Sequence, residues 1–557
     1  MATKTDLIFT GGWTFTAASN TPERLGVAVS DGRIKAIGPD VEILAAATEQ
    51  TRVVDLDGAL LIPGFQDAHV HPASAGMELL QCNLSDAESA ADALGTIAAY
   101  AAKYPGAEWI LGGGWSMDHF PGGTPTRQAL DRLVPDRPVL LFNRDHHGAW
   151  ANTRAFELAG IHAGTADPAD GRIERESDGS PAGTVHEGAM NLFDHVRPAA
   201  HPDLVYAGLL RAQEELFGFG ITGWQDAAVG ALFGASDTLE TYSAAVSEKT
   251  LRAHVRGAQW WERDSGLEQL PRLTERRADV AARLPGDAFS AGTVKIMVDG
   301  VAENFTAAMT TPYLDNHGHC TDNAGLSFID PERLKEYVTA LDAAGFQVHF
   351  HALGDRAVRE ALDAVEAARR VNGPSGNRHH LAHLQVVSEA DAPRFAELDV
   401  VVNMQALWAC HESQLDELTL PFLPADAESR HYPFGELLAS GARLAAGSDW
   451  PVSSANPIEA IHVAVNRVAP HSPSGPLGDP SQRLDLATAL TAYTAGSAYV
   501  NHRDHDTGMI APGYLADLAV LRPNPFELAP QDLHTTAVTS TWVRGEQVYA
   551  AASNTNR

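Results

Sequence analysis

Two histidines separated by one residue, His69 and His71, directly follow an apolar run in the sequence. Side chains at positions i and i+2 of a β-strand point to the same side, so both imidazoles can reach one metal ion from one backbone segment. The chain has 24 histidines, and a pair with this spacing also arises by chance. The pair therefore indicates a metal site only if further ligands follow elsewhere in the chain.

Further side chains suited to a metal site lie at the ends of later apolar, strand-like runs. They are Lys295 in GTVKIMV, His351 in FQVHFH, His383 in HLAHL and Asp449 in LAAGSD. Each has an ordinary explanation when taken alone. A lysine can reach the surface along its apolar stem, a histidine can be buried with hydrogen-bond partners, and an aspartate can cap a helix. Their occurrence at successive strand ends favours one shared catalytic centre.

The elements that must position these groups are strands of a barrel. Apolar runs alternate with helical stretches through the middle of the chain, which is the pattern of parallel βα units. Eight strands are expected, near residues 61–68, 220–225, 253–258, 292–298, 346–351, 380–384, 400–405 and 444–449. Eight such units predict an α/β fold, the (β/α)8 TIM barrel, whose chemistry lies at the C-terminal ends of its strands.

Three further parts of the chain are predicted around this barrel. Residues 1–60 and 501–557 contain short apolar runs broken by turn signals, which favours one small β-sandwich built from both termini. The barrel then takes residues 61–500. The gap after its first strand is too long for a βα loop, so residues 75–205 are expected to form a large insertion over the barrel mouth.

Composition narrows the location and the partners of the protein. Lys plus Arg total 40 and Asp plus Glu total 71, which gives a formal charge of −31 and disfavours nucleic acid and membrane partners. Three cysteines without a CxxC pair exclude a cysteine zinc knuckle and fit a reducing compartment. There is no signal-like N-terminus and no apolar run of ~20 residues. We therefore expect a cytoplasmic protein, a homodimer, that acts on a small molecule.

Several motifs together resemble those of the amidohydrolase superfamily. They are LIPGFQDAHVHP, DHHGAWANTRAFELAGI, GTVKIMVDGVAENFTA, HFHALGDRAV, HHLAHLQ, GSDWPV and GMIAPGYLADLAVL, which span nearly the whole chain. Within the superfamily they resemble the branch of YtcJ-like proteins and N-substituted formamide deformylases. The resemblance implies hydrolysis of a C–N, amide-type bond by a metal-activated hydroxide, with an N-substituted formamide or another N-acyl amine as the expected substrate.

The resemblance also implies a role for each member of the set. His69 and His71 would bind one metal ion, and His351 and His383 would bind a second. Lys295, carboxylated at its amine, would bridge the two ions, which are expected to be Zn²⁺.

Asp449 would complete the implied set as a ligand of the first ion and as the proton shuttle. One departure from the family concerns the segment that holds His383. Here His380-Leu381-Ala382-His383 stands where the family often has Arg-Ile-Glu-His. The ligand is kept, but the hydrogen bonding that supports it is put in doubt.

Aromatic and polar residues outside this set are candidate substrate contacts. They are Trp115, Phe120, His147, His186, Asp299 and Trp408. Trp115 and Phe120 could instead form the core of the insertion, and His186 could simply begin a helix. Asp299 follows the strand of Lys295, and Trp408 follows the seventh predicted strand, which places it near the barrel rim.

Two other functions are compatible with such a barrel. Many barrel deaminases of heterocyclic amines carry a glutamate three residues after the histidine of the fifth strand, whereas His351 is followed by Ala352, Leu353 and Gly354. Lys295 also favours a site with two metals over a deaminase. A barrel that has lost catalysis and serves as a scaffold usually lacks some ligands, whereas this chain keeps a complete set.

Overall fold

The centre of the computed structural model, which describes residues 5–231, 236–284, 286 and 288–552, is one sheet of eight parallel strands. In order around the sheet they are β7 (Phe65–Val70), β14 (Ile221–Val229), β15 (His254–Trp260), β16 (Phe289–Met297), β17 (Gln347–Ala352), β18 (His380–His383), β19 (Val401–Met404) and β20 (Leu444–Ala446). Every strand expected from the sequence is present in its expected place, and the barrel fold class is confirmed.

Side-chain and backbone contacts join the first barrel strand to the last two, β19 and β20. The Asn403 amide donates to the Ala68 carbonyl at 2.9 Å, and the backbone N–H of Ser448 donates to the Asp67 carboxylate at 3.1 Å. A Cβ at Gly447 would lie 2.5 Å from the His69 nitrogen, so only glycine allows this approach. The ends of β7 and β20, which carry His69 and Asp449, are thereby held side by side.

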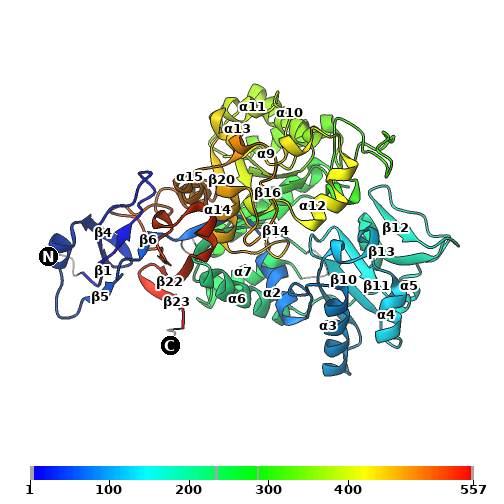
Figure 1. Cartoon of the computed structure of the whole chain (residues 1–557), viewed down its shortest axis with the longest axis horizontal. Helices are drawn as coiled ribbons and strands as arrows, with labels where there is room; N and C mark the ends of the chain where they lie inside the picture. Colours follow the sequence, from blue (N-terminus) through cyan, green and yellow to red (C-terminus); the bar gives the residue numbers. More distant parts are fainter. Residues whose placement is uncertain (1–4, 232–235, 285, 287, 553–557) are drawn as a thin grey trace.

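Helices cover the outside of the barrel (Figure 1). Among them, α9 (Pro331–Ala343) begins where the Asp330 side chain accepts from two backbone N–H groups, with proline at the first helical position. The following helix, α10 (Asp355–Asn372), buries an alanine- and valine-rich stripe against the strands and exposes its charged face. The structure therefore repeats strand and helix in the manner of βα units.

Strands from both ends of the chain combine beside the barrel. A five-stranded sheet consists, in order, of β2 (Trp13–Thr14), β6 (Leu60–Pro63), β21 (Leu518–Arg522), β22 (Ala537–Val543) and β23 (Glu546–Ala550). In it β6 pairs antiparallel with β21. A four-stranded sheet consists, in order, of β4 (Arg33–Gly38), β3 (Gly26–Ser30), β1 (Leu7–Thr10) and β5 (Arg52–Asp55). The two sheets share an apolar core that includes Phe9, Leu61 and Trp542. Only Gly64 separates β6 from β7, so the terminal sheets connect directly to the first barrel strand.

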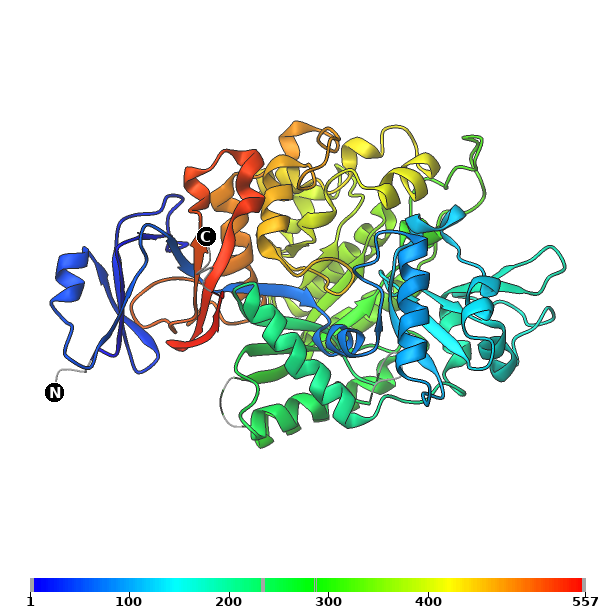
Figure 2. The ribbon, with the colours of Figure 1, turned by 60° about the horizontal axis from the view of Figure 1, so that its bottom comes forward.

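A six-stranded sheet lies in the segment between β7 and the helix α6 (Pro202–Gly218). Its strands are β8 (Cys82–Asn83), β9 (Ile110–Trp115), β10 (Val139–Asn143), β11 (Gly148–Ala151), β12 (Gly171–Arg175) and β13 (Pro181–Glu187). Both views place it at the opposite end of the barrel from the terminal sheets (Figures 1 and 2). The expected boundaries of the terminal β-sandwich (1–60 and 501–557), the barrel (61–500) and the insertion (75–205) stay predictions. Among the described residues, no helix is long and apolar enough to span a bilayer.

Candidate metal centre and catalytic site

One carboxylate oxygen joins the two histidines at the end of β7. The Oδ1 atom of Asp449 lies 3.1 Å from Nε2 of His69 and 3.0 Å from Nε2 of His71. His69 lies on β7, and every residue of this strand is buried. The alternation along β7 therefore turns both rings to the same carboxylate, as the spacing predicts.

The neighbouring strands bring the remaining members of the predicted set to the same place. Nζ of Lys295, on β16, lies 3.4 Å from Nε2 of His69. The ring centroids of His351, on β17, and His383, on β18, are 4.4 Å apart, and that of His383 is 4.8 Å from that of His69. One ligand atom from each of His69, His383 and Asp449 can be chosen so that all lie within 4.8 Å of one another.

The backbone adopts an uncommon conformation at two of these residues. The φ angles of His383 and Asp449 are +80° and +58°, in the left-handed region that non-glycine residues seldom occupy. The Gln405 side chain accepts from the backbone N–H of His383, and the His69 carbonyl accepts from that of Asp449. These contacts hold two strand ends in a conformation that turns their side chains toward the centre.

Buried polar atoms without a hydrogen-bond partner indicate that this group of residues suits a metal ion. In the described part of the chain, both ring nitrogens of His383 lack a hydrogen-bond partner, although the residue is only 2% exposed. Buried polar groups nearly always have a partner, so an orphaned imidazole needs another ligand. Imidazole nitrogens and carboxylate oxygens, with no thiolate among them, match the donors that Zn²⁺ and similar divalent ions accept. The residues present therefore fit a divalent metal.

The electrostatics of the cluster keep these groups in their metal-binding forms. Burial, followed by the charge of Lys295, lowers the pKa of His69 to about 3, and burial also holds the pKa of His351 and His383 well below the usual range. Burial would raise the pKa of Asp449, but the adjacent His69 and His71 outweigh it and hold this pKa well below the ordinary value. The imidazoles of His69, His351 and His383 are therefore neutral and Asp449 is a carboxylate.

Lys295 is the basic group of the cluster, and burial lowers the pKa of its amine to about 7. The side chain is 2% exposed. A large share of the amine is therefore neutral near neutral pH, which is the form that can react as a nucleophile.

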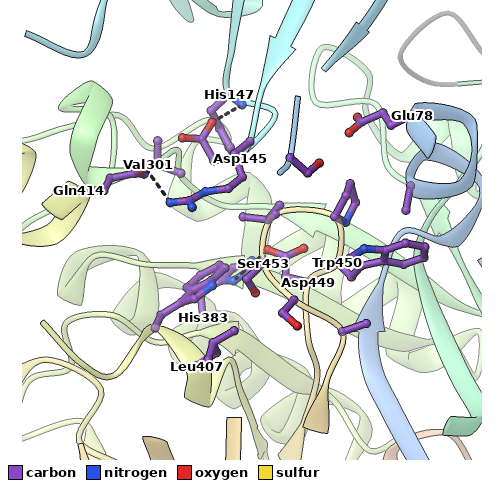
Figure 3. A pocket seen from close by; sticks show the side chains of 18 of the residues that line it. Glu78, Asp145, His147, Val301, His383, Leu407, Gln414, Asp449, Trp450 and Ser453 are labelled. Carbon is purple, nitrogen blue, oxygen red and sulfur yellow. Dashed lines mark hydrogen bonds and ion pairs between the residues drawn. The ribbon is translucent and has the colours of Figure 1, made fainter. Parts of the chain in front are cut away.

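Two cavities meet at this cluster. One has a volume of about 590 Å³ and the other about 520 Å³. Residues that line both are Asp145, His147, His351, His383, Asp449, Pro451 and Val452. Figure 3 shows Asp145 and His147 across the cavity from His383 and Asp449. A molecule in either cavity can therefore reach the carboxylate and imidazole groups.

Residues 52–549 match the profile of the amidohydrolase family. The chain belongs to the amidohydrolase family. It is 30% identical over 98% of its length to the LONG AFTER FAR-RED 3 protein of Arabidopsis thaliana, 91% of which is covered. The YtcJ protein of Bacillus subtilis is 29% identical, with 97% of this chain and 99% of YtcJ covered. The N-substituted formamide deformylase of Arthrobacter pascens is 27% identical, with coverages of 93% and 94%. The resemblance drawn from the sequence motifs is confirmed.

A solved structure has the same fold as this amidohydrolase. The crystal structure of an uncharacterized metal-dependent hydrolase from Pyrococcus furiosus superposes with a TM-score of 0.70 at 23% identity. The match covers 94% of this chain and 99% of that one. At this identity the match shows a shared fold, and the family match identifies the chain as a member of the amidohydrolase family.

Two of the six candidate substrate contacts lie at the cavities of the amidohydrolase. Nδ1 of His147 lies 2.9 Å from the carboxylate of Glu187, and its ring is 5.4 Å from that of His351. Trp408 lines the larger cavity and stacks on His383, with centroids 5.3 Å apart. His147 comes from the six-stranded sheet and Trp408 from the barrel, so both parts of the chain border the site.

The other four candidates line neither cavity in the part of the chain that the structure describes. Trp115 is fully buried, donates from Nε1 to the Leu141 carbonyl at 2.8 Å, and packs against Phe120 in the core of the six-stranded sheet. Nε2 of His186, which is 1% exposed, lies 3.2 Å from a carboxylate oxygen of Glu174. Asp299 is 0% exposed and accepts three backbone N–H groups behind His351. The structure therefore places these four side chains away from both cavities, and a contact between them and substrate stays a prediction.

Replacing Trp115 by alanine tests whether this residue serves the core of the six-stranded sheet or contacts substrate. We expect a loss of about 3–5 kcal/mol in the free energy of unfolding, since a large buried ring is removed, and an unchanged KM. Trp408→Ala is the matched comparison, with a raised KM and a smaller loss of stability. Urea unfolding and steady-state kinetics measure both effects. A stable Trp115→Ala enzyme with a raised KM would return Trp115 to the substrate contacts.

Polar residues beneath the centre escaped the sequence analysis. His349 lies two residues before His351 on the same strand, and its Nε2 is 2.9 Å from Nδ1 of His69. Gln225, on β14, lies 2.8 Å from the other ring nitrogen of His349. The i, i+2 spacing of His349 and His351 in FQVHFH was a signal for His349, because it repeats the spacing of His69 and His71. No comparable signal marks Gln225.

Proposed function

We propose that this metal-dependent hydrolase cleaves the C–N bond of a small amide, with an N-substituted formamide or another N-acyl amine as substrate. The observation that carries the proposal is the convergence of His69, His71, His351, His383 and Asp449 on one buried point with orphaned ring nitrogens. The N-substituted formamide deformylase among the relatives supports the substrate class.

We propose further that two divalent ions, Zn²⁺ by preference, bind in the site. His69 and His71 would hold one, His351 and His383 the other. When bound, the ions would polarise the substrate carbonyl and lower the pKa of a water molecule toward neutrality. Lys295 supports this arrangement, because its buried and largely neutral amine can take up carbon dioxide. The carboxylated side chain would be an anion, and its two oxygens would lie between the two metal ions.

Asp449 would move the proton during hydrolysis. Its Oδ1 is shared by His69 and His71, whereas Oδ2 lies 3.8 Å from Nδ1 of His383, beyond hydrogen-bond distance. We assign Oδ2 as the atom that accepts the proton of the attacking water and returns it to the leaving nitrogen. The low pKa of Asp449 keeps this oxygen unprotonated at the start of the cycle. The products would be a carboxylic acid and an amine.

The cavities would hold the groups on either side of the scissile bond. Trp408 offers an apolar face beside His383, and the smaller cavity is lined in part by Phe142, Met190 and Trp260. Such walls favour an apolar N-substituent. We propose a homodimer in the cytoplasm as the state in which the enzyme works, and analytical ultracentrifugation tests the dimer.

Metal removal and replacement tests the activity. The purified protein is assayed on N-formyl and N-acetyl derivatives of benzylamine and butylamine, with ureas, lactams and aminopyrimidines beside them. Dialysis against a chelator should abolish amide hydrolysis, and Zn²⁺ should restore it, because no other described group supplies an acidified water. Elemental analysis should find close to two ions per chain in the active protein.

Other outcomes would contradict the proposal. Release of ammonia from the aminopyrimidines, without cleavage of any amide, would make the protein a deaminase. Fully loaded protein that turns over nothing on the panel would exclude the proposed reaction. Full activity after complete metal removal would exclude the metal-dependent route.

A further inference from the structure

The centre rests on a buried chain of side-chain amides and imidazoles. From His69 the hydrogen bonds pass to His349 at 2.9 Å, to Gln225 at 2.8 Å, and on to His380 at 3.0 Å. Every member is at most 1% exposed. Each imidazole has two nitrogens of which, when neutral, one donates and the other accepts. The positions of the protons in this chain therefore decide which nitrogen of His69 can bind a metal.

The far end of this chain of hydrogen bonds is fixed by groups that can act only as donors or only as acceptors. The Gln347 amide nitrogen donates to the backbone carbonyls of Arg378 and Val500, at 2.8 and 2.9 Å. Its oxygen accepts from Nε of Arg256 at 3.1 Å, and a guanidinium N–H is always a donor. Gln347 can therefore have only one orientation, with its oxygen toward Gln225.

That orientation determines the next two groups. The Gln225 atom 3.2 Å from the Gln347 oxygen must be the amide nitrogen, since two oxygens would repel each other. The Gln225 oxygen consequently faces Nδ1 of His349 and Nε2 of His380. Both of these ring nitrogens must carry a proton in order to donate to it.

The proton on Nδ1 of His349 leaves the other ring nitrogen as an acceptor. His349 is 0% exposed, and in the described part of the chain no carboxylate lies within ion-pair distance of it, so its ring carries a single proton. Nε2 of His349 must then accept from Nδ1 of His69, which therefore carries the proton of that ring. The free electron pair of His69 is left on Nε2, the atom that faces Asp449 and Lys295.

A second set of contacts, which begins at the backbone of His383, gives the same tautomer for His380. The backbone N–H of His383 donates to the Gln405 oxygen at 2.6 Å, so the Gln405 nitrogen donates to the Asn403 oxygen at 3.2 Å. The Asn403 nitrogen then donates to Nδ1 of His380 at 3.1 Å. This leaves the proton of His380 on Nε2, where Gln225 requires it.

We propose that Gln225 and His349 are positioning residues that fix His69 in the tautomer with Nδ1 protonated and Nε2 open to a metal. The chain links this ring to the Arg256 guanidinium on one side and to the backbone of His383 on the other. The inference rests on the proposed metal site, and it concerns how that site is prepared before any metal arrives. Such hydrogen-bonded supports of a ligand typically contribute 10–100-fold to metal affinity.

Zn²⁺ affinity of matched variants tests the proposal. In His349→Leu the acceptor for Nδ1 of His69 is lost, and we expect Zn²⁺ affinity, measured by competition with a chromophoric chelator, to fall about 10–100-fold. In His349→Gln the new amide oxygen can accept in place of Nε2, and we expect affinity within a few-fold of the natural protein. His462→Leu, at a buried histidine (3% exposed) outside this hydrogen-bonded network, is the control with unchanged affinity.

The tautomer itself gives a second readout that does not need metal or substrate. Nitrogen NMR of histidine-labelled, metal-free protein, with His69 assigned through His69→Gln, should show Nδ1 protonated, and this state should be lost in His349→Leu. A His69 ring protonated at Nε2, or a folded His349→Leu protein with natural Zn²⁺ affinity, would overturn the inference. Protein that shows the expected tautomer but hydrolyses no amide would refute only the proposed activity.

Discussion

Replacing Asp449 by asparagine is expected to lower kcat about 100- to 10,000-fold, the range of a lost general acid–base group. The amide keeps the shape of the side chain and can still lie between His69 and His71, but it cannot accept a proton at the position of Oδ2. The low pKa of Asp449 means that the natural enzyme has the required carboxylate at neutral pH. Turnover is to be measured at saturating Zn²⁺ so that weaker metal binding does not imitate slower chemistry.

A buried aspartate at the other end of the barrel is the control for this substitution. Asp517 lies 3.1 Å from His254 and contacts no member of the centre in the described structure. Asp517→Asn should reduce stability while leaving kcat of the folded fraction unchanged. An Asp449→Asn enzyme that keeps near-natural turnover with its metal bound would remove Asp449 from the proton path.

Replacing Lys295 by methionine is expected to lower the metal content from two ions per chain to one or none. Methionine fills the space of the buried stem but cannot become a carboxylate, so the proposed bridge is lost. Hydrolysis should fall in parallel with the second ion. Adding bicarbonate during metal loading should raise the metal content of the natural protein and leave that of Lys295→Met unchanged.

An exposed lysine supplies the matched control for the bridge. Lys335 forms an ion pair with Glu332 on the surface of α9, and Lys335→Met should leave metal content and turnover unchanged. If Lys295→Met protein still bound two ions per chain, the carboxylated bridge would be wrong. If it bound one ion and kept full activity, the second ion would have no part in the reaction.

The barrel could be predicted from the sequence because two independent features indicate its strands. Each is an apolar run, and several end in a residue that is costly to bury without a purpose, such as Lys295 or Asp449. The least accurate strand was β7, expected at 61–68 but running from Phe65 to Val70, since Leu60–Pro63 forms β6 of the terminal sheet. Strand existence therefore followed from pattern, whereas strand ends depended on tertiary contacts.

The substrate-facing residues could not be predicted in the same way. An aromatic side chain satisfies a small core and a cavity wall equally well, so residue type did not separate Trp115, which is buried in the six-stranded sheet, from Trp408, which borders the larger cavity. Nor did it reveal Gln225, because an uncharged amide carries no sequence signal until its partners are known. The difference between the two tryptophans and the role of Gln225 both depend on which strands become neighbours.

The pairing of β6 with β21 also sets the order in which the metal centre can form in the cell. β6 leads straight into β7 and its histidine pair, but β21 is synthesised near the end of the chain. At about 5–20 residues per second, a ribosome needs roughly half a minute to a minute and a half to pass from one strand to the other. For most of that interval β7 lacks β20, and throughout it lacks the pairing of β6 with β21. If the proposed metal site forms as argued above, nascent chains that end before β20 should therefore be unable to bind Zn²⁺ at this site.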